Sequence, residues 1–171
     1  FFSAPKLYFA DGLGNALTFP LSVGATSILM AGRPTVNSVM KIIREKKPTL
    51  FFGVPTLYAS LLKENLNKDD FSSLRLGVSA GEALPAHLYE KLLNNFGVKV
   101  LDGIGTTEML HMFISNRIDK IFPGSTGIPV PGYKARIIKD NGKLANSNEM
   151  GELEINGPSS AIGYWNKKEK T

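Results

Sequence analysis

The sequence predicts an α/β fold: a mainly parallel sheet flanked by helices, followed by the start of an antiparallel β subdomain. Two observations support this prediction. Up to about residue 122, short apolar segments alternate with segments of helical periodicity, and further on the apolar and polar residues alternate one by one. Repeated β–α–β order is typical of a parallel sheet covered by helices. With 171 residues, 43% of them apolar, the chain is long enough to form a packed core.

Four short segments have the apolar character of buried strands. They are residues 26–30 (TSILM), 49–52 (TLFF), 75–79 (RLGVS) and 98–101 (VKVL). Each is too short for a helix and is bounded by turn-forming or polar residues. We expect all four in one sheet.

Three helices are expected between these strands, because apolar residues recur there at spacings of three and four. Pro55 and Pro85 suit helix starts, and Gly97 suits a helix end. The apolar stripes are Val36, Val39, Met40 and Ile43 in the first helix, Leu57, Tyr58, Leu61 and Leu62 in the second, and Leu88, Leu92 and Phe96 in the third.

The character of the chain changes after about residue 124. Residues 134–139 (KARIIK) and 152–156 (ELEIN) alternate apolar and polar side chains, and Asp140-Asn141-Gly142 between them predicts a turn. We therefore expect antiparallel strands here. The Pro- and Gly-rich segment 122–132 suggests the boundary, which divides the chain into an α/β subdomain (1–122) and a β-rich subdomain (123–171).

The composition excludes several classes of function. The absence of Cys excludes disulfides, a thiolate zinc site and a cysteine nucleophile, and is compatible with a cytoplasmic protein. No apolar run reaches the roughly 18 residues of a membrane span. The net charge of +5 is scattered, which argues against a nucleic-acid partner.

Three strand ends carry residues suited to a ligand, namely segments 53–56, 80–85 and 102–108. In open α/β sheets, ligands bind beyond the carboxyl ends of the strands. Glycines allow close approach of the backbone, hydroxyls suit phosphate oxygens, and a single carboxylate suits a magnesium ion shared with a nucleotide. These features predict a nucleotide-phosphate site. The alternative is that the glycines only form tight turns and the hydroxyls cap helices.

Three motifs carry a family resemblance. DGIGTTEMLHMFISN (102–116) resembles the signature of adenylate-forming enzymes, the superfamily of acyl- and aryl-CoA ligases, luciferases and peptide-synthetase adenylation domains. SAGEALP (79–85) and GELEINGPSSAIGYW (151–165) resemble further motifs of that family, in the same order. EMLHMFISNR and PGSTGIPVPGYKARI look most like benzoate- and 4-hydroxybenzoate-CoA ligases.

The resemblance implies a two-step reaction. A carboxylate attacks the α-phosphorus of ATP and gives an acyl-adenylate and pyrophosphate, and the thiol of coenzyme A then displaces AMP. The implied ligands are ATP, Mg²⁺, coenzyme A and a small carboxylic acid of the benzoate type. Fatty-acid or amino-acid activation, or a non-catalytic nucleotide-binding module, remain alternatives, and a homodimer remains open.

The resemblance also implies roles for single residues in nucleotide binding. Asp102 accepts a hydrogen bond from the adenine amino group, Ile104 packs on the base, and Thr107 holds the α-phosphate. Glu108 binds magnesium. The whole nucleotide set is Gly81, Glu82, Ala83, Asp102, Gly103, Ile104, Gly105, Thr106 and Thr107. The alternative reading makes Thr107 a helix cap and Glu108 a surface residue.

The acyl group is assigned to a second set. By the same resemblance, Thr107, Glu108 and His111 form the catalytic set, with His111 as a hydrogen-bond donor to the substrate carboxylate. The alternative is that His111 is a structural histidine. His87, early in a helix, is expected at the surface. The substrate set is Ala10, Asp11, Gly105, Met109 and His111.

Asp11 departs from the pattern of the branch. The matching segment of benzoate enzymes reads Ala followed by Tyr, whereas this chain has Ala10 followed by Asp11. If Asp11 faces the pocket, the expected substrate carries a hydrogen-bond donor on its ring. The alternative is that Asp11 caps a helix that starts near Gly12.

Two further expectations concern the ends of the chain. By resemblance, the phosphate loop of the family would lie before Phe1, and its hinge and small C-terminal domain after Thr171. We therefore expect about a third of a ligase, which does not complete the reaction alone. Tyr164 and Trp165 are expected to pack in or under the β subdomain.

Overall fold

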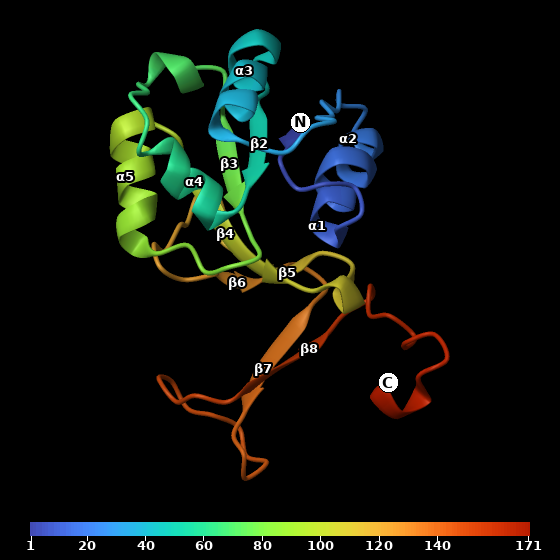
Figure 1. The fold of residues 1–171 in the computed structure, drawn as a ribbon. Helices are drawn as coiled ribbons and strands as arrows, with labels where there is room; N and C mark the ends of the chain where they lie inside the picture. Colours follow the sequence, from blue (N-terminus) through green and yellow to red (C-terminus); the bar gives the residue numbers. More distant parts are fainter.

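The computed structural model describes all 171 residues and contains one six-stranded sheet and one separate two-stranded sheet (Figure 1). In the larger sheet, the first four strands are parallel and the last two are antiparallel to their neighbours. This confirms the predicted α/β class. The strand order is β1 (Phe2–Ser3), β2 (Leu50–Gly53), β3 (Leu76–Ser79), β4 (Val100–Gly105), β5 (Met112–Ser115) and β6 (Ile128–Pro129).

The three predicted helices are present as α3 (Val36–Lys46), α4 (Pro55–Leu61) and α5 (Ala86–Phe96). They pack next to one another. A further helical unit, α1 (Ala10–Leu13), a π-helical turn and α2 (Phe19–Ser22), lies across the strands from α5 (Figure 1). Both layers of helices therefore shield the sheet, as expected for β–α–β order.

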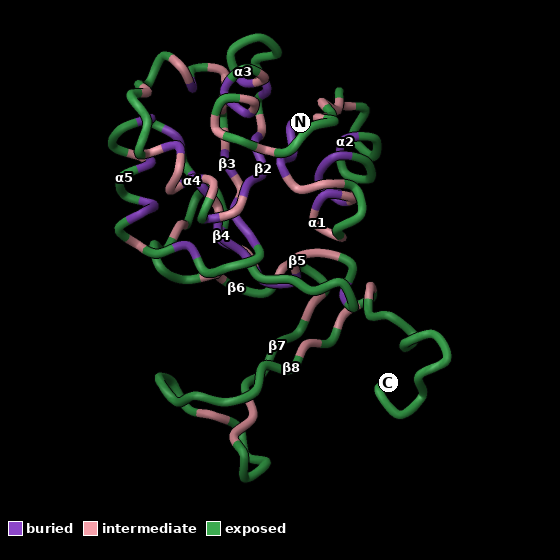
Figure 2. The backbone as a smooth tube through the Cα atoms, in the orientation of Figure 1, coloured by how far each residue is buried: buried purple, intermediate pink, exposed green.

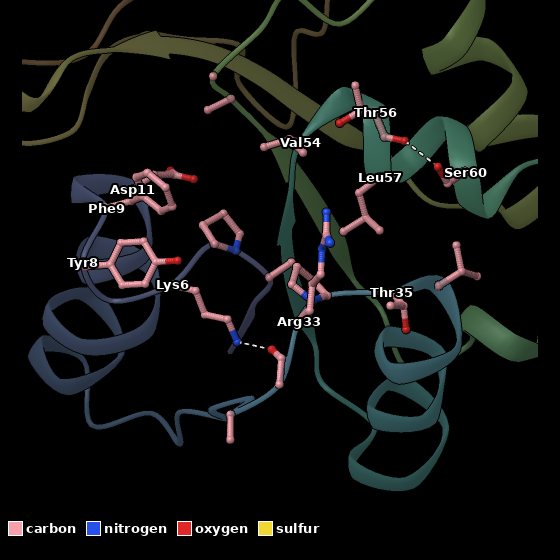
Figure 3. A pocket seen from close by; sticks show the side chains of 18 residues that line it. Lys6, Tyr8, Phe9, Asp11, Arg33, Thr35, Val54, Thr56, Leu57 and Ser60 are labelled. Atoms are coloured by element: carbon pink, nitrogen blue, oxygen red, sulfur yellow. Dashed lines mark hydrogen bonds between the residues drawn. The ribbon is translucent and has the colours of Figure 1, made fainter.

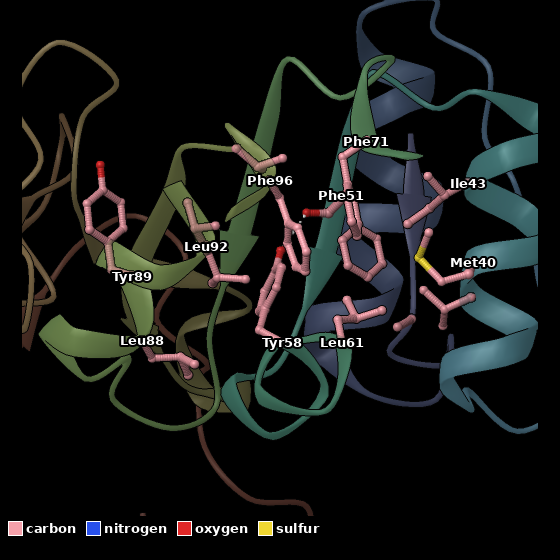
Figure 4. Close-up of a cluster of buried hydrophobic side chains, with 14 of the residues drawn as sticks. Met40, Ile43, Phe51, Tyr58, Leu61, Phe71, Leu88, Tyr89, Leu92 and Phe96 are labelled. Atoms are coloured by element: carbon pink, nitrogen blue, oxygen red, sulfur yellow. Dashed lines mark hydrogen bonds between the residues drawn. The ribbon is translucent and has the colours of Figure 1, made fainter. Parts of the chain in front are cut away.

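The core lies between the sheet and α3, α4 and α5 (Figure 4). Phe2 and Phe51 stack across β1 and β2 with ring centroids 5.4 Å apart. The buried Tyr58 hydroxyl donates to the carbonyls of Phe51 and Val78 at 3.2 and 3.1 Å, which ties α4 to β2 and β3. Each fully buried side chain of this size stabilises the fold by about 1.5–3 kcal/mol.

Local sequence explains the helix ends. At the start of α3, Thr35 and Ser38 form a capping box: the Ser38 N–H donates to Thr35 Oγ1 at 3.2 Å, and the Thr35 N–H donates to Ser38 Oγ at 2.9 Å. Pro55 is the first residue of α4, and Pro85 precedes α5. α5 ends at Gly97 with φ +70°, a conformation that favours glycine.

The predicted strand at residues 26–30 is wrong. Only Ile28 pairs there, in an isolated bridge to Phe2, and Leu29 is 62% exposed. The first position in the sheet is taken by β1 at the start of the chain instead. The fourth strand also differs from expectation, because β4 continues through Gly105 and places residues 102–105 in a strand rather than in a turn.

The predicted antiparallel pair is present as β7 (Lys134–Ile138) and β8 (Glu152–Asn156). A turn follows β7, in which the Gly142 N–H donates to the Lys139 carbonyl at 2.8 Å. The pair projects from the larger sheet and is largely exposed (Figures 1 and 2). The larger sheet ends at β6, inside segment 122–132, and a division of the chain into two subdomains there remains a prediction.

No helix in the structure combines the length and the apolar character needed to cross a bilayer. His87 is exposed on α5, as expected. The packing expected for Trp165 is wrong, because this side chain is 89% exposed. Tyr164 is half exposed and contacts the segment that follows β4 rather than the two-stranded sheet.

Candidate functional site

A cavity of about 180 Å³ lies at the carboxyl ends of β3 and β4, where the topology predicts a ligand site. Most of its lining was predicted from the sequence, although the residues come from three distant segments. The lining residues are Phe9, Ala10, Asp11, Ala80, Gly81, Gly105, Thr106, Thr107, His111 and Met112.

The imidazole of His111 is held by contacts from the first helical unit. Its Nε2 lies 3.2 Å from Asp11 Oδ1 but has no hydrogen-bond partner in the chain, whereas that Oδ1 accepts a hydrogen bond from Asn15 Nδ2 at 2.9 Å. Phe19 packs edge-on against the imidazole with a centroid distance of 4.7 Å. Gly14 leaves the necessary space, because a Cβ there would lie 2.5 Å from His111 Cδ2. Both the position and the orientation of His111 are therefore fixed.

Asp11 is not a helix cap. α1 begins after Phe9, and Asp11 lies inside the helix with its carboxylate toward the cavity and His111. The capping alternative is therefore wrong. The π-helical turn Gly14–Thr18 follows directly, and π turns are frequent at functional sites.

The turn after β4 separates the roles of two threonines. Thr106 caps the 3₁₀ turn Thr107–Met109, because its Oγ1 accepts a hydrogen bond from the Met109 N–H at 3.3 Å. Thr107 lines the cavity, and its hydroxyl has no hydrogen-bond partner in the chain. The reading of Thr107 as a cap is therefore wrong. Leu110 ends the turn with φ +69°, a strained conformation of the kind that clusters at functional sites.

Glu108 projects from the same turn and is exposed. The Tyr164 hydroxyl donates a hydrogen bond to Glu108 Oε1, and this contact holds the pKa of Glu108 below its ordinary value and raises that of Tyr164. No cluster of three or more metal-binding side chains surrounds Glu108. A cation bound here would therefore take its other ligands from bound phosphate or water.

The carboxylate of Asp102 is buried beside the loop after β3. Its Oδ2 accepts a hydrogen bond from the Leu84 N–H at 3.1 Å, whereas Oδ1 has no partner. Burial raises the pKa of Asp102. Gly81 adopts φ +88° and has no atom closer than 3.8 Å to the position of a Cβ, so this loop is open to a ligand.

Residues 1–165 match the family described as AMP-binding enzyme. The chain belongs to this family. It is 52% identical to a benzoate–CoA ligase from Thauera aromatica over 99% of the chain and 33% of that protein. The chain thus spans about a third of the length of this curated relative. The similarity confirms the benzoate–CoA ligase branch that the motifs predicted.

Two solved structures of aromatic-acid CoA ligases are also similar to the chain. A benzoate CoA ligase from Burkholderia xenovorans LB400 superposes with a TM-score of 0.96 at 51% identity, over 99% of this chain and 35% of that one. The anthranilate CoA ligase AuaEII, in complex with anthranoyl-AMP, superposes with a TM-score of 0.94 at 42% identity, over 99% and 33% of the two chains.

Three groups in this AMP-binding chain fit a nucleotide. Asp102 Oδ1 is a buried acceptor without a donor, Gly81 leaves open space, and Thr107 is an exposed residue of the cavity wall. Buried polar atoms are almost always hydrogen-bonded in folded proteins. The unpaired Oδ1 fits a hydrogen-bond donor such as an amino group, but Asp102 lines neither the cavity nor the neighbouring groove, so its role toward adenine remains a prediction. The assignments of Glu82, Ala83 and the other predicted nucleotide residues remain predictions.

Not every predicted residue faces the ligand. A Cβ at Gly103 would lie 2.6 Å from Met112 Sδ, and one at Gly105 would lie 2.4 Å from the His111 carbonyl oxygen. Both glycines are therefore required by the close packing of β5 on β4. Gly105 also lines the cavity, whereas Gly103 is buried.

Met109 does not line the cavity as expected. It is 8% exposed and packs with Phe113 and Ile114, because the 3₁₀ turn points it inward. Met112 takes the place on the cavity wall, since it follows the turn in β5. The sequence held no signal that could distinguish the two methionines.

Other residues of the site were missed. Phe9 and Met112 line the cavity, while Gly14, Asn15 and Phe19 support His111 and Asp11. Ala80 also lines it and belongs to segment 80–85, which was expected at the ligand. Helical periodicity from Asp11 could have indicated Asn15, four residues later. The remaining contacts join distant segments and leave no local pattern.

A larger groove adjoins the cavity and shares Phe9, Asp11, Ala80 and Gly81 with it (Figure 3). Its volume is about 1020 Å³, large enough for a small organic ligand. Lys6 Nζ donates to the carbonyl of Met30 and so joins the segment after β1 to the segment that precedes α3. The cavity around His111 thus lies directly beside this larger groove.

Proposed function

We propose that this chain is part of an AMP-forming acid–thiol ligase that activates a benzoate-type aromatic acid with ATP and transfers it to coenzyme A. The carrying observation is the cavity that brings His111 and Asp11 together with Thr107 and Gly81. Membership of the AMP-binding family and similarity to benzoate–CoA ligases support the proposal. We place this activity in the cytoplasm, and a homodimer would be compatible with it.

The residues have separate tasks in this proposal. His111 donates a hydrogen bond to the carboxylate of the acid and orients it toward the α-phosphorus of ATP. Thr107 donates its hydroxyl to the α-phosphate, and Asp102 accepts from the adenine amino group. Magnesium, when bound to Glu108, supplies positive charge that offsets the phosphate oxygens. Catalysis is then mainly positioning and charge neutralisation.

The proposed reaction has two steps. A carboxylate oxygen forms a bond to the α-phosphorus, and the bond from that phosphorus to the bridging oxygen breaks to release pyrophosphate. The thiolate of coenzyme A then attacks the acyl carbon. The bond between the acyl carbon and the AMP oxygen breaks, which gives a thioester and AMP.

The position of Asp11 restricts the range of aromatic acids that we expect as substrates. A carboxylate on the cavity wall accepts hydrogen bonds, so it favours a ring with an amino or hydroxyl group over an unsubstituted ring. The match to an enzyme solved with anthranoyl-AMP, an aminobenzoyl adenylate, supports this choice. Asp11 Oδ1 lies 3.2 Å from His111 Nε2, which supports a role for both groups at the same end of the cavity.

The function is tested by ATP–pyrophosphate exchange in an enzyme that carries this chain together with the flanking segments of its relatives. We expect exchange with aromatic acids and not with fatty acids or amino acids. His111→Ala should lower kcat/KM for the aromatic acid at least tenfold, the loss typical of a charge-assisted hydrogen bond. His87→Ala is the matched control on an exposed helix surface. Equal losses in both variants, or exchange with fatty acids, would contradict the proposal.

Substrate choice is tested separately with benzoate, hydroxybenzoates and aminobenzoates. Asp11→Tyr should shift the preference toward benzoate, because it restores the aromatic wall of the benzoate branch. An unchanged substrate preference in this variant would contradict the role of Asp11 in substrate choice and leave the ligase proposal intact.

A further inference from the structure

The segment after β8 forms a strap, residues 157–164, over the turn that carries Glu108. Its backbone is fixed at the turn because the Ala161 N–H donates to the Glu108 carbonyl at 2.7 Å. Ser159 Oγ donates to the Met109 carbonyl at 2.6 Å. The strap thus binds the backbone of the turn at two adjacent residues before it reaches the carboxylate of Glu108.

The start of the strap is equally constrained. Gly157 lies against the ring of Tyr133, where a Cβ would approach the ring carbon Cδ1 to 2.2 Å. The Tyr133 hydroxyl hydrogen-bonds Ser159 Oγ at 2.6 Å. Tyr133 precedes β7 and the strap follows β8, so the strap is connected to both strands of the two-stranded sheet. Its path over the turn is therefore defined by packing as well as by hydrogen bonds.

At the far end of the strap, the Tyr164 hydroxyl donates to Oε1 of Glu108. No lysine, arginine or histidine forms an ion pair with Glu108, although the chain forms five ion pairs elsewhere. A neutral phenol donor holds the carboxylate without neutralising it. The negative charge of Glu108 is consequently kept for a cation.

A single carboxylate held in this way suits a magnesium ion. Magnesium requires near-octahedral geometry, keeps several waters, and is bound through one or two carboxylates together with substrate phosphates. Carboxylates that ligate a metal are in turn hydrogen-bonded by neighbouring groups, which fix their orientation. With Oε1 occupied by a donor, Oε2 is the oxygen left for the ion.

We propose that Tyr164 is a positioning residue for the metal-binding carboxylate: its hydroxyl holds Oε1 of Glu108 and directs Oε2 toward the magnesium ion of ATP. The inference rests on the proposed function, since it takes Glu108 as the magnesium ligand. It assigns a role to a residue that the sequence placed only in the packing of the β subdomain.

The test is a magnesium titration of the full-length enzyme with ATP, followed both as direct magnesium binding by isothermal calorimetry and as ATP–pyrophosphate exchange. Tyr164→Phe removes only the hydroxyl. It should raise the magnesium concentration for half-maximal rate at least tenfold, the lower end of the effect of removing such an outer partner. The rate at saturating magnesium and the KM for the aromatic acid should stay unchanged, which a loss of structure would not allow.

Tyr133→Phe is the matched control. It removes the hydroxyl that supports the strap at Ser159 and leaves the contact at Glu108 intact. The magnesium dependence of this variant should equal that of the parent enzyme. An equal rise in both variants would overturn the inference, because it would attribute the effect to the placement of the strap rather than to the Tyr164 hydroxyl.

Glu108→Gln separates this inference from the proposed function. If Glu108→Gln leaves the magnesium dependence unchanged, the assignment of Glu108 fails and the inference fails with it. If Glu108→Gln raises the magnesium requirement and Tyr164→Phe does not, only the inference fails. If both are correct, adding Tyr164→Phe to Glu108→Gln should cause no further rise, since the hydroxyl then has no carboxylate to orient.

Discussion

At the scale of single residues, His111 is held by three neighbours that serve different purposes. Asp11 lies 3.2 Å from Nε2, Phe19 packs on the ring edge, and Gly14 provides the space for Cδ2. The motif around His111 predicted the histidine itself. Its support could not be predicted, because the need for glycine at position 14 arises from a side chain almost a hundred residues away.

This support predicts the effect of Gly14→Ala. The added methyl group would overlap His111 Cδ2 and lie 3.1 Å from Phe19 Cε2, so the imidazole must move. Since a displacement of about 1 Å can cost 10²-fold in rate, kcat/KM for the aromatic acid should fall at least tenfold. The KM for ATP should not change. Gly32→Ala, where no atom lies within 4 Å of the new methyl group, is the control in the same kinetic assay.

The buried carboxylate of Asp102 predicts a pH dependence of stability. Burial raises its pKa in the folded chain above the ordinary value of 3.8, so the folded state holds the proton more tightly than the unfolded state. Asp102 therefore contributes stability that is fully present below pH 3.8 and is lost as the pH rises through the folded-state pKa.

Asp102→Asn removes this titration, and its Oδ1 can still accept from the Leu84 N–H. The free energy of unfolding of the variant, relative to the parent chain, should rise as the pH is raised from 3.8 through the folded-state pKa toward neutrality. Urea denaturation at a series of pH values measures this difference. Parallel curves for the two proteins would contradict the assigned cause.

At the scale of elements, helices were predicted better than short strands. The stripes of α3, α4 and α5 are long enough for periodicity to distinguish them, and prolines and glycine mark their ends. β1 has only two residues, so it carries no alternation at all. Residues 26–30 have the apolar composition of a strand, but a strand also needs a free sheet edge with a matching register, which the sequence does not state.

The end of α5 gives a prediction at this scale. Gly97 has φ +70°, and its nearest neighbour to a Cβ is Lys68 Cδ at 3.8 Å, so Ala meets a backbone penalty and no clash. Gly97→Ala should therefore lower the free energy of unfolding by about 1–2 kcal/mol. Gly32→Ala has space and no positive φ, so its effect should be neutral or slightly stabilising. Thermal or urea unfolding of both variants measures the contrast.

At the scale of the whole molecule, the cavity joins the first helical unit, the loop after β3 and the turn after β4. The rule that ligands bind at strand ends predicted where these segments meet. It could not predict which side chains of each segment face the cavity: Met109 was expected there, but Met112 lines the cavity and Met109 is packed in the core. Which methionine faces the cavity depends on the 3₁₀ turn Thr107–Met109, which is capped by the hydroxyl of Thr106.

Because the chain spans a third of the length of its relative, we expect that it does not form an acyl-adenylate by itself. ATP should bind weakly, through the groups around Gly81 and Asp102. Isothermal titration with ATP and a mass-spectrometric assay for adenylate measure the two expectations on the chain of 171 residues. Detection of adenylate from the purified chain would contradict the prediction.

The exposed two-stranded sheet has a consequence for local stability. β7 and β8 bury little apolar surface, and their pairing relies largely on five backbone register pairs and an ion pair between Arg136 and Glu154. Segments of this kind open without global unfolding. Amide protons of β7 and β8 should therefore exchange with solvent deuterium long before those of β2 and β3. The strap that begins at Gly157 continues from β8 and contacts Tyr133 before β7, so each such opening would remove one of its supports and leave it held by its own hydrogen bonds to the turn of Glu108.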